Sequence, residues 1–391
     1  MTVTFRVFKK GSSDGRITIY LGRREFVDHV TGSDPIDGVV HIDKEFINDK
    51  KVTVQLICTF RYGREEDETM GLCFKKELTL AEMVLFPEGG ESQPPPSRLQ
   101  ERLLNKMGKN TFPFTLNFPM HSPTSVILTM APGEVGEPCG VEYYIRAKIA
   151  STTDKNRESM VNMAIRKIQY APTKPGRQPC TVVRKDFALT PGELELEATL
   201  DRQLYYHGDD IKVSICVKNN SQKIVKKIVV NVVQCIDVAM FTGGHHTSRI
   251  FRVETSEGCP IGPGSSLQKQ FILYPSARFC GKSGVAIDGN QKGDDATLAS
   301  STLLADENNR DIFGLVISYS VKVKLMLGAI GGELAAELPF VLMHPKPNMR
   351  KMMKADTLSF NNSQDNEEPL VDLGNSMQDG LRMEPLRRRN V

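Results

Sequence analysis

Apolar and polar residues alternate with a period of two over most of the chain. Successive side chains of a β-strand point to opposite faces, so each alternating run predicts a strand with one buried face. The runs are short, and turns rich in glycine and proline separate them without intervening helical patterns. This organisation is typical of antiparallel β-sandwiches. The clearest runs cover residues 17–21, 52–60, 125–130, 141–149, 161–170, 194–200, 211–217, 223–241, 267–274, 314–327 and 336–343.

One segment follows the period of a helix instead. Within residues 97–109, Leu99, Leu103 and Met107 recur every four residues, after three consecutive prolines and ahead of a terminating glycine. This spacing predicts one amphipathic helix of about three turns. In a β-protein such a helix must lie on the outer face of a sheet. We expect its apolar stripe to pack against Val7 of the first strand and against a docked C-terminal tail.

A linker and a polar tail divide the chain. A Pro/Gly-rich segment at residues 171–179 separates the predicted strands into two sets, and alternation ends after residue 347. The polar segment that follows cannot bury enough apolar surface to fold alone, so it is expected to be disordered or docked. The sequence therefore predicts an all-β fold of two antiparallel β-sandwich domains, with one short amphipathic helix on the N-terminal domain. The expected divisions are a first sandwich at 1–170, a hinge linker at 171–183, a second sandwich at 184–347 and a flexible regulatory tail at 348–391.

Composition narrows the functional class. The chain has 391 residues, enough for two full-sized cores, and its net charge of +3 gives no global field that would attract nucleic acid. Its eight cysteines are scattered without a C-x-x-C pair, the N-terminus does not resemble a signal peptide, and no apolar run approaches membrane-spanning length. We therefore expect a soluble cytoplasmic protein with free thiols.

Candidate catalytic and metal motifs do not hold. Gly281-Lys282-Ser283 resembles the end of a phosphate-binding loop, but Ser276 stands where that loop needs glycine, and the following residues have an extended pattern. His245-His246 has no cysteine or carboxylate at ligand spacing and is interpreted as part of a solvated loop. The sequence accordingly predicts no enzyme, no metal and no cofactor.

An arginine interrupts an apolar row in the strand predicted at residues 161–170. A guanidinium buried there is costly unless carboxylates surround it, and breaking such a cluster is strongly disruptive. Arg166 is therefore a candidate switch that an incoming anion could disturb. The alternative is that Arg166 lies near a strand end and extends its head to water. Alternation places Val161, Met163, Ile165 and Lys167 on one face and Ala164, Arg166, Ile168 and Tyr170 on the other.

Two sets of basic residues are candidate anion-binding surfaces. Lys and Arg supply charge-assisted hydrogen bonds to phosphates if the fold gathers them, and are otherwise ordinary solvated side chains. The first set is Lys9, Lys10, Arg24, Lys106, Arg157 and Lys292. The second set, a candidate for phosphoinositide headgroups, is Lys226, Lys227, Lys322 and Lys324. Within it, Lys322 and Lys324 alternate with valines, as the solvent face of a strand does.

An ordered series of motifs resembles the arrestin family. The motifs run in sequence over about residues 5–347. They include V-F-K-K at 7–10, Y-L-G-R-R-E-F-V-D-H at 20–29, F-R-Y-G-R-E-E-D at 60–67, I-R-K-I-Q-Y-A-P at 165–172, Y-Y-H-G at 205–208 and L-P-F-V-L-M-H-P-K-P at 338–347. The segments Y-G-R-E-E-D-E-T-M-G at 62–71 and E-G-C-P-I-G-P-G at 257–264 are most similar to invertebrate visual arrestins.

The resemblance implies a function as well as a fold. It implies a non-enzymatic cytoplasmic protein, recruited to receptor-bearing membranes, that binds an activated, phosphorylated rhodopsin-like G-protein-coupled receptor and blocks G-protein access. It places Arg166 in a buried polar core with Asp288 and Asp295, and puts Glu25 where the family usually has aspartate. Receptor phosphates are expected at Lys9, Lys10, Arg24, Lys106 and Lys292. The loop expected to enter the receptor cavity comprises Tyr62, Gly63, Arg64, Glu65, Glu66, Asp67, Glu68, Thr69, Met70, Gly71 and Leu72.

The tail departs from the pattern of the non-visual members. Residues 367–384 contain no phenylalanine, and Arg382 or one of the arginines at 387–389 is left as a possible partner of the polar core. The segment at 370–373, L-V-D-L, resembles most of a clathrin-binding box but is followed by Gly374 instead of an acidic residue. Clathrin binding is therefore disfavoured. The alternative function is an endocytic or membrane-sorting adaptor that binds receptor cargo and phosphoinositides or inositol phosphate.

Overall fold

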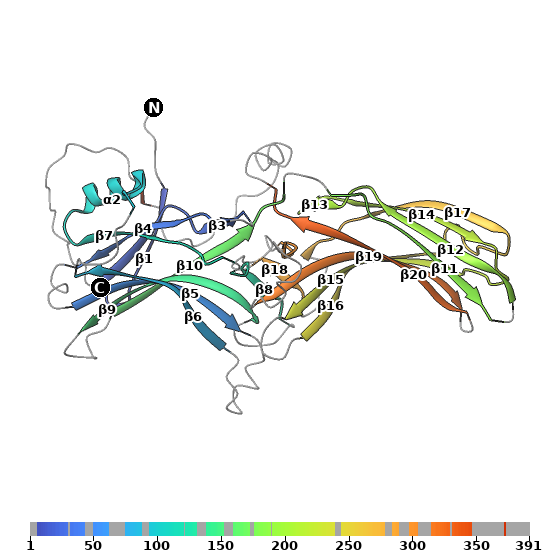
Figure 1. Ribbon diagram of the computed structural model, residues 1–391, viewed down its shortest axis with the longest axis horizontal. Helices are drawn as coiled ribbons and strands as arrows, with labels where there is room; N and C mark the ends of the chain where they lie inside the picture. The colour runs from blue at the N-terminus through green and yellow to red at the C-terminus, as the bar shows by residue number, and fades with distance from the viewer. Residues whose placement is uncertain are drawn as a thin grey trace, which may run out of the picture.

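In the computed structural model, two β-sandwiches lie end to end along the long axis of the molecule (Figure 1). The all-β, two-sandwich architecture predicted from the alternation is confirmed, and nearly all neighbouring strands are antiparallel. Two strand pairs, β10 with β3 and β13 with β20, are parallel. The structure describes residues 6–29, 32–43, 50–61, 75–87, 94–120, 122–130, 138–151, 159–172, 176–188, 190–238, 244–277, 284–288, 297–303, 314–328, 331–345 and 371–372.

The first sandwich packs two sheets against each other. One sheet has the strand order β21-β1-β2-β4-β7, and the other has the order β18-β8-β9-β10-β3 with β5 and β6 added beside β9. The bounds are β1 (Arg6–Gly11), β2 (Ile17–Leu21), β3 (Glu25–Asp28), β4 (Ile36–Ile42), β5 (Lys50–Arg61), β6 (Lys75–Phe86), β7 (Thr111–Leu116), β8 (Val126–Leu128), β9 (Gly140–Ser151), β10 (Ser159–Gln169), β18 (Ala286–Asp288) and β21 (Val371–Asp372).

The second sandwich also has two sheets, with the strand orders β11-β12-β14-β17 and β13-β20-β19-β15-β16. Its first strand, β11, begins at Cys180, so the last residues of the expected linker at 171–183 already pair with β12. The bounds are β11 (Cys180–Phe187), β12 (Thr190–Leu200), β13 (Leu204–Tyr206), β14 (Ile211–Asn219), β15 (Lys227–Val238), β16 (Gly244–Thr255), β17 (Ser265–Leu273), β19 (Leu315–Gly328) and β20 (Gly332–Met343).

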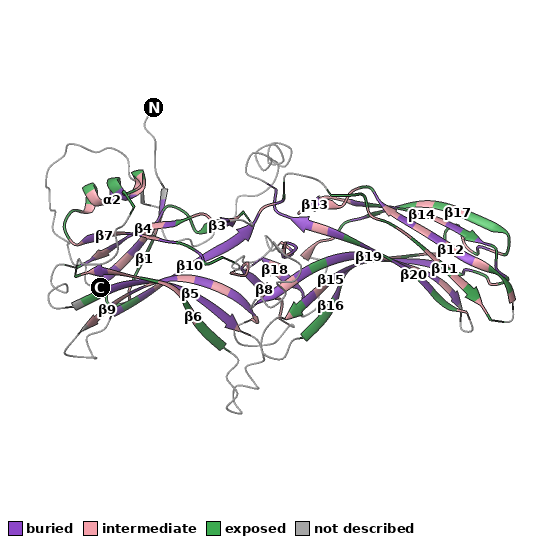
Figure 2. Ribbon diagram, viewed as in Figure 1, coloured by how far each residue is buried: buried purple, intermediate pink, exposed green. Residues whose placement is uncertain are grey.

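The apolar member of each alternating pair faces the partner sheet. In β14, for example, Ile211, Val213 and Val217 are fully buried while Lys212 and Lys218 are exposed. Figure 2 shows this banding of buried and exposed residues along the strands of both sandwiches. Complete burial of one such aliphatic side chain contributes about 1.5–3 kcal/mol. The alternation is therefore the pattern that fixes which face of each strand is the core.

One α-helix, α2 (Arg98–Met107), occurs in the described part of the chain and lies on the outer face of the first sandwich (Figure 1). Ser97 caps its start in a reciprocal capping box with Gln100, which satisfies backbone N–H groups that the helix leaves open. Leu103 is buried in a small cluster with Val7 and Val39, against which the rest of the apolar stripe packs. The helix is too short and too polar to cross a membrane.

The two sandwiches meet through strands that cross between them. β18 belongs to the second half of the sequence, yet it pairs with β8 of the first sandwich. At the end of β10, Tyr170 forms a parallel bridge to His344, and the Ala171 N–H donates to the His344 carbonyl oxygen at 3.2 Å. The junction therefore brings the ends of β10, β18 and β20 to one place.

Candidate functional site

Arg166 lies at the junction and is paired within the first sandwich. It stands opposite Glu25 in the parallel register of β10 and β3, and its guanidinium forms an ion pair with the Glu25 carboxylate. The Arg166 side chain is 9% exposed, whereas that of Glu25 is 44% exposed. A buried cation thus has a partner that remains half in solvent. This is not the geometry of an arginine that extends its head to water.

Asp288 brings a second carboxylate to the junction from the end of β18. Its side chain is 5% exposed, accepts a hydrogen bond from Thr297 Oγ1 at 2.9 Å and forms an ion pair with His344. Burial by itself would raise the Asp288 pKa, but the hydrogen bond from His344 and the charges of His344, His207 and Arg166 outweigh it, and the pKa lies below its ordinary value. Asp288 is therefore ionised at neutral pH within the field of Arg166.

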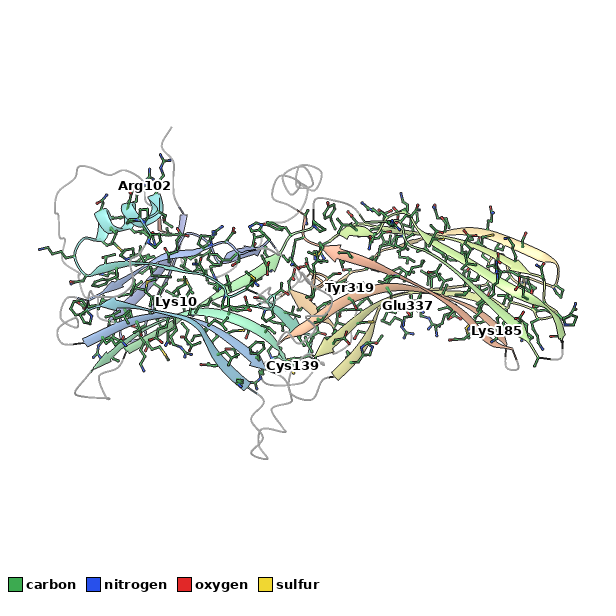
Figure 3. The ribbon with its side chains drawn as sticks, in the orientation of Figure 1. Lys10, Arg102, Cys139, Lys185, Tyr319 and Glu337 are labelled. Carbon is green, nitrogen blue, oxygen red and sulfur yellow. The ribbon has the colours of Figure 1, made fainter. Side chains whose placement is uncertain are left out.

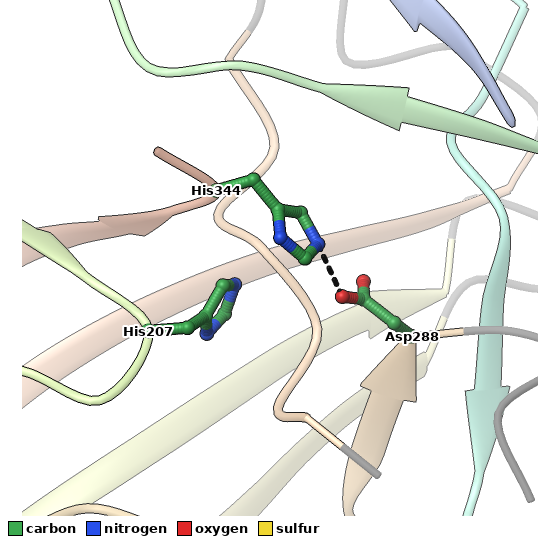
Figure 4. Close-up of side chains that lie close together, drawn as sticks. All are labelled: His207, Asp288 and His344. Atoms are coloured by element: carbon green, nitrogen blue, oxygen red, sulfur yellow. Dashed lines mark hydrogen bonds and ion pairs between the residues drawn. The ribbon is translucent and has the colours of Figure 1, made fainter. Parts of the chain in front are cut away.

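Two histidines complete this part of the junction (Figure 4). The rings of His207 and His344 have centroids 4.6 Å apart, and His207 Nε2 lies 3.1 Å from Ser300 Oγ. Each of His207, Asp288 and His344 offers one ligand atom, and these atoms lie within 4.8 Å of one another. Both histidines fall inside motifs quoted above, but their proximity to Asp288 was missed, because only the tertiary fold brings these distant segments together.

A second buried cation, Lys167, is the next residue of β10. Its ammonium donates to Asp28 Oδ2 at 2.6 Å and to the Ser122 carbonyl oxygen, and lies 5.6 Å from the Phe118 ring centroid. Burial lowers the Lys167 pKa, and the charge of Asp28 only partly opposes that shift. The alternation had grouped Lys167 with Val161, Met163 and Ile165, and the structure shows that this face is the sandwich interior. The apolar row around Arg166 made that residue conspicuous in the sequence, whereas the burial of Lys167 became evident only in the folded sandwich.

The predicted phosphate-binding residues that the structure describes are exposed around β1 and α2. Lys9 and Lys10 are exposed on β1, and Lys106 is exposed in the last turn of α2. Arg24 donates from Nε to the Ala164 carbonyl oxygen at 2.9 Å, and its guanidinium lies 5.9 Å from the Phe8 ring centroid. Figure 3 shows Lys10 on the first sandwich.

The tail segment β21 runs along the same strand. Arg6 pairs with Asp372, and Val7 pairs with Val371, so β21 forms the edge of the sheet beside β1. Val371 and Asp372 lie within the segment that resembles a clathrin box. Other predicted site residues lie outside the described residues, namely Asp295, Arg157, Lys292 and the loop at 62–72.

The lysines considered for phosphoinositide binding lie on one sheet of the second sandwich. Lys227 forms an ion pair with Glu254, Lys322 with Glu337 at 3.2 Å, and Lys324 with Glu333 at 2.8 Å. Lys226 is exposed. Three of the four lysines are thus already neutralised by neighbouring carboxylates, although exposed pairs of this kind are weak.

The structure places His245-His246 in a strand and not in the solvated loop that was expected. The pair begins β16, and His245 Nδ1 lies 2.6 Å from Asp237 Oδ1 on the neighbouring strand β15. The loop assignment was wrong because cross-strand register, which a single sequence does not show, supplies the carboxylate. His245 nevertheless remains largely exposed.

Comparison with known proteins finds a match to the same family for both halves of the chain. A family profile described as the arrestin (or S-antigen) N-terminal domain matches residues 17–171, and the corresponding C-terminal domain profile matches residues 190–347. Phosrestin-2 of Calliphora vicina is 53% identical over 362 residues, which span 91% of this chain and 99% of that protein. An arrestin homologue of Heliothis virescens is 53% identical over 360 residues, spanning 91% and 94%. The red cell arrestin isoform 1 of Oncorhynchus mykiss is 43% identical over 345 residues, spanning 88% and 84%.

Proposed function

The chain belongs to the arrestin family, and we propose that it binds an activated, phosphorylated rhodopsin-like receptor and ends its signalling by blocking G-protein access. It would do so by occupying the receptor, without catalysing a reaction. The observation that carries the proposal is the buried Arg166–Glu25 ion pair in the field of Asp288, which comes from the second half of the chain. A charge cluster that spans a domain junction is suited to report the arrival of an anion.

The first step of the proposed mechanism is capture of receptor phosphates at β1. Lys9 and Lys10 are exposed there and offer charge-assisted donors, with Arg24 and Lys106 on neighbouring elements. The tail strand β21 lies along the same strand. A phosphorylated receptor segment that docks at β1 therefore competes with the tail for one edge of the sheet.

The second step is disturbance of Arg166. A phosphate that reaches the half-exposed Glu25 side competes with this carboxylate for the Arg166 guanidinium. Loss of one member of a buried ion cluster costs about 3–5 kcal/mol, and the solvent exposure of Glu25 places this pair toward the lower end. Allosteric couplings amount to about 1–3 kcal/mol, so disruption of this single pair is sufficient to shift the protein from its basal state.

The remaining roles follow the family pattern and complete the proposal. Asp295 would join the polar core, and Arg157 and Lys292 would add phosphate contacts. The loop at 62–72 would enter the receptor cavity, with its acidic run facing basic helix ends of the receptor. The segment at 171–183 would act as the hinge, and the tail at 348–391 would regulate access. The protein would then move from the cytoplasm to receptor-bearing membranes.

Co-sedimentation with native photoreceptor membranes tests this function. The protein is mixed with membranes that are dark or illuminated, each with or without prior phosphatase treatment, and the pelleted fraction is measured. We expect the largest fraction with illuminated, untreated membranes and the smallest with dark membranes. Equal sedimentation with dark and illuminated membranes would refute the proposal.

The adaptor alternative rests on the lysines of the second sandwich, and the ion pairs of Lys227, Lys322 and Lys324 weaken it. A phosphoinositide headgroup would have to displace three glutamates. Vesicle flotation with and without a phosphoinositide separates the two functions. Binding that needs the lipid headgroup and is indifferent to receptor activation would favour the adaptor.

A further inference from the structure

The His207–Asp288–His344 cluster has a composition that the receptor mechanism does not use. Two imidazoles and one carboxylate converge at the domain junction, with their ligand atoms within 4.8 Å of one another (Figure 4). We propose that these three side chains form a binding site for a divalent transition-metal ion of the zinc type. This inference does not depend on the proposed receptor function.

The donor set selects the class of metal. Imidazole nitrogen suits Zn²⁺ and its first-row neighbours, whereas Mg²⁺ and Ca²⁺ prefer sites built from oxygen alone. Zn²⁺ takes histidine and aspartate in four-coordinate sites, with the last position open to water or another ligand. The Ser300 hydroxyl lies 3.1 Å from His207 Nε2, so a further oxygen is near the cluster.

Two of the ligands are already assembled. His344 and Asp288 form a direct ion pair, and both side chains are almost completely buried. Bonds of about 2.0–2.2 Å to a tetrahedral ion place ligand atoms about 3.3–3.5 Å apart, so His344 and Asp288 must separate slightly and His207 must approach. His207 is the side chain able to move, because it is only half-buried and follows β13 in a turn. Gly208, in the left-handed region at φ +94°, adjoins it in that turn.

Two hydrogen bonds hold the proposed ligands and their segments in place. Thr297 Oγ1 donates to Asp288 Oδ2 at 2.9 Å, a contact of the kind that fixes the orientation of a ligating carboxylate. The backbone N–H of His207 donates to the Met343 carbonyl oxygen at 3.2 Å, which ties the turn after β13 to the residue before His344.

An ion at this site would tie three segments together. The turn after β13 and the end of β20 belong to the second sandwich, while β18 pairs with β8 of the first. Binding would therefore stabilise the junction and hold Asp288 toward the histidines. The structure thus assigns to the cluster a role in fixing the position of a carboxylate that also lies in the field of Arg166.

Zinc titration of the full chain tests the proposal. The protein is stripped with a chelator, and Zn²⁺ is added in competition with a chromophoric indicator while the melting temperature is followed in parallel. We expect one ion per chain and a higher melting temperature on binding. His207→Gln and His344→Asn should each weaken the binding by at least about tenfold. The matched control, His245→Gln/His246→Gln, removes an exposed histidine pair and should leave affinity and melting shift unchanged.

Two results would overturn the site. One is the absence of saturable Zn²⁺ binding by the wild-type chain. The other is equal affinity in wild type and His207→Gln, especially if the control variant loses binding, since the ion would then sit on the surface pair. His207→Gln carries the test if His344→Asn does not fold, because His207 is only half-buried. Co²⁺ in place of Zn²⁺ should give the visible absorption of a four-coordinate site in wild type and lose it in His207→Gln.

Discussion

Arg166 and Lys167 are adjacent on β10, and both are buried, yet their surroundings differ. Lys167 points into the first sandwich, where its side chain is 2% exposed and its partner Asp28 is 17% exposed. Arg166 points to the domain junction, where its partner Glu25 is 44% exposed and Asp288, from the second half of the chain, adds its charge. Both cations lie near the junction, since Lys167 lines a cavity with Thr302 and Leu315 from the second half of the chain. They differ in their partners, because Asp28 is much less exposed than Glu25.

The difference shows where a buried charge can serve as a switch. The Asp28 carboxylate that holds Lys167 is only 17% exposed, so an anion from solvent reaches this ion pair less readily, although Lys167 and Asp28 both line a cavity at the junction. The carboxylate that holds Arg166 is in contact with solvent, and its second acidic neighbour belongs to a segment from the other half of the chain. A competing anion can therefore weaken the Arg166 pair without unfolding either sandwich.

The largest expected effect is on the enclosed cation. Lys167→Met removes the buried ammonium that pairs with Asp28 and should lower the free energy of unfolding by about 3–5 kcal/mol. Denaturant titration measures this loss. Adding Asp28→Leu removes the carboxylate of the same pair and should restore most of the stability. A loss below about 1 kcal/mol would contradict the view that Lys167 is enclosed, because exposed pairs contribute no more than that.

The sequence predicted only part of this contrast between Arg166 and Lys167. Alternation predicted strands such as β5 and β14 almost to their ends, because each has one fully buried face. It also placed Lys167 on the face of Val161, but a single sequence does not show which face meets the partner sheet. β18 was predicted only as an extended stretch after Ser283, since three residues carry too little periodicity to show that they pair with β8 far away in the chain. For the same reason the histidines beside Asp288 could not be assigned to the site.

A substitution in helix α2 should release the tail while leaving Arg166 and Lys167 unchanged. Leu103→Ala opens a cavity in the small cluster with Val7 and Val39, and should cost about 2–5 kcal/mol, toward the lower end because the cluster is small. Since Val7 also pairs with β21, limited proteolysis after residue 350 should accelerate. The half-buried Leu99 offers a milder control, Leu99→Ala. Unchanged protection of the tail in Leu103→Ala would show that helix and tail are independent.

Asp288 gives the junction a pH dependence. Its folded-state pKa lies below the ordinary value of about 4, so the ionised carboxyl stabilises the fold above that pH, and the contribution is lost as pH falls through the lowered pKa. Asp288→Asn should therefore be less stable than wild type by about 1–3 kcal/mol at pH 7, and the difference should shrink in acid. Urea unfolding at several pH values measures it. A difference that grows in acid would contradict the assignment.

The smallest effect is expected for the exposed ion pairs between strands β19 and β20 of the second sandwich. Lys322→Gln/Lys324→Gln removes two exposed ion pairs and should change the free energy of unfolding by less than about 1 kcal/mol. Thermal or chemical unfolding provides the comparison. A loss as large as that of Lys167→Met would mean that exposure is a poor guide to the strength of these pairs.

In the proposed mechanism Arg166, and not its neighbour Lys167, holds the basal state. The most direct test of this role is the ratio of binding to illuminated membranes before and after phosphatase treatment. Arg166→Glu should bring this ratio close to one by raising binding to the unphosphorylated receptor, and Lys167→Met/Asp28→Leu should keep the wild-type ratio. The exchange Arg166→Glu/Glu25→Arg re-pairs the charges in register and should partly restore selectivity, as should Arg166→Glu/Asp288→Arg across the junction. A folded Arg166→Glu protein with the wild-type ratio would contradict the account.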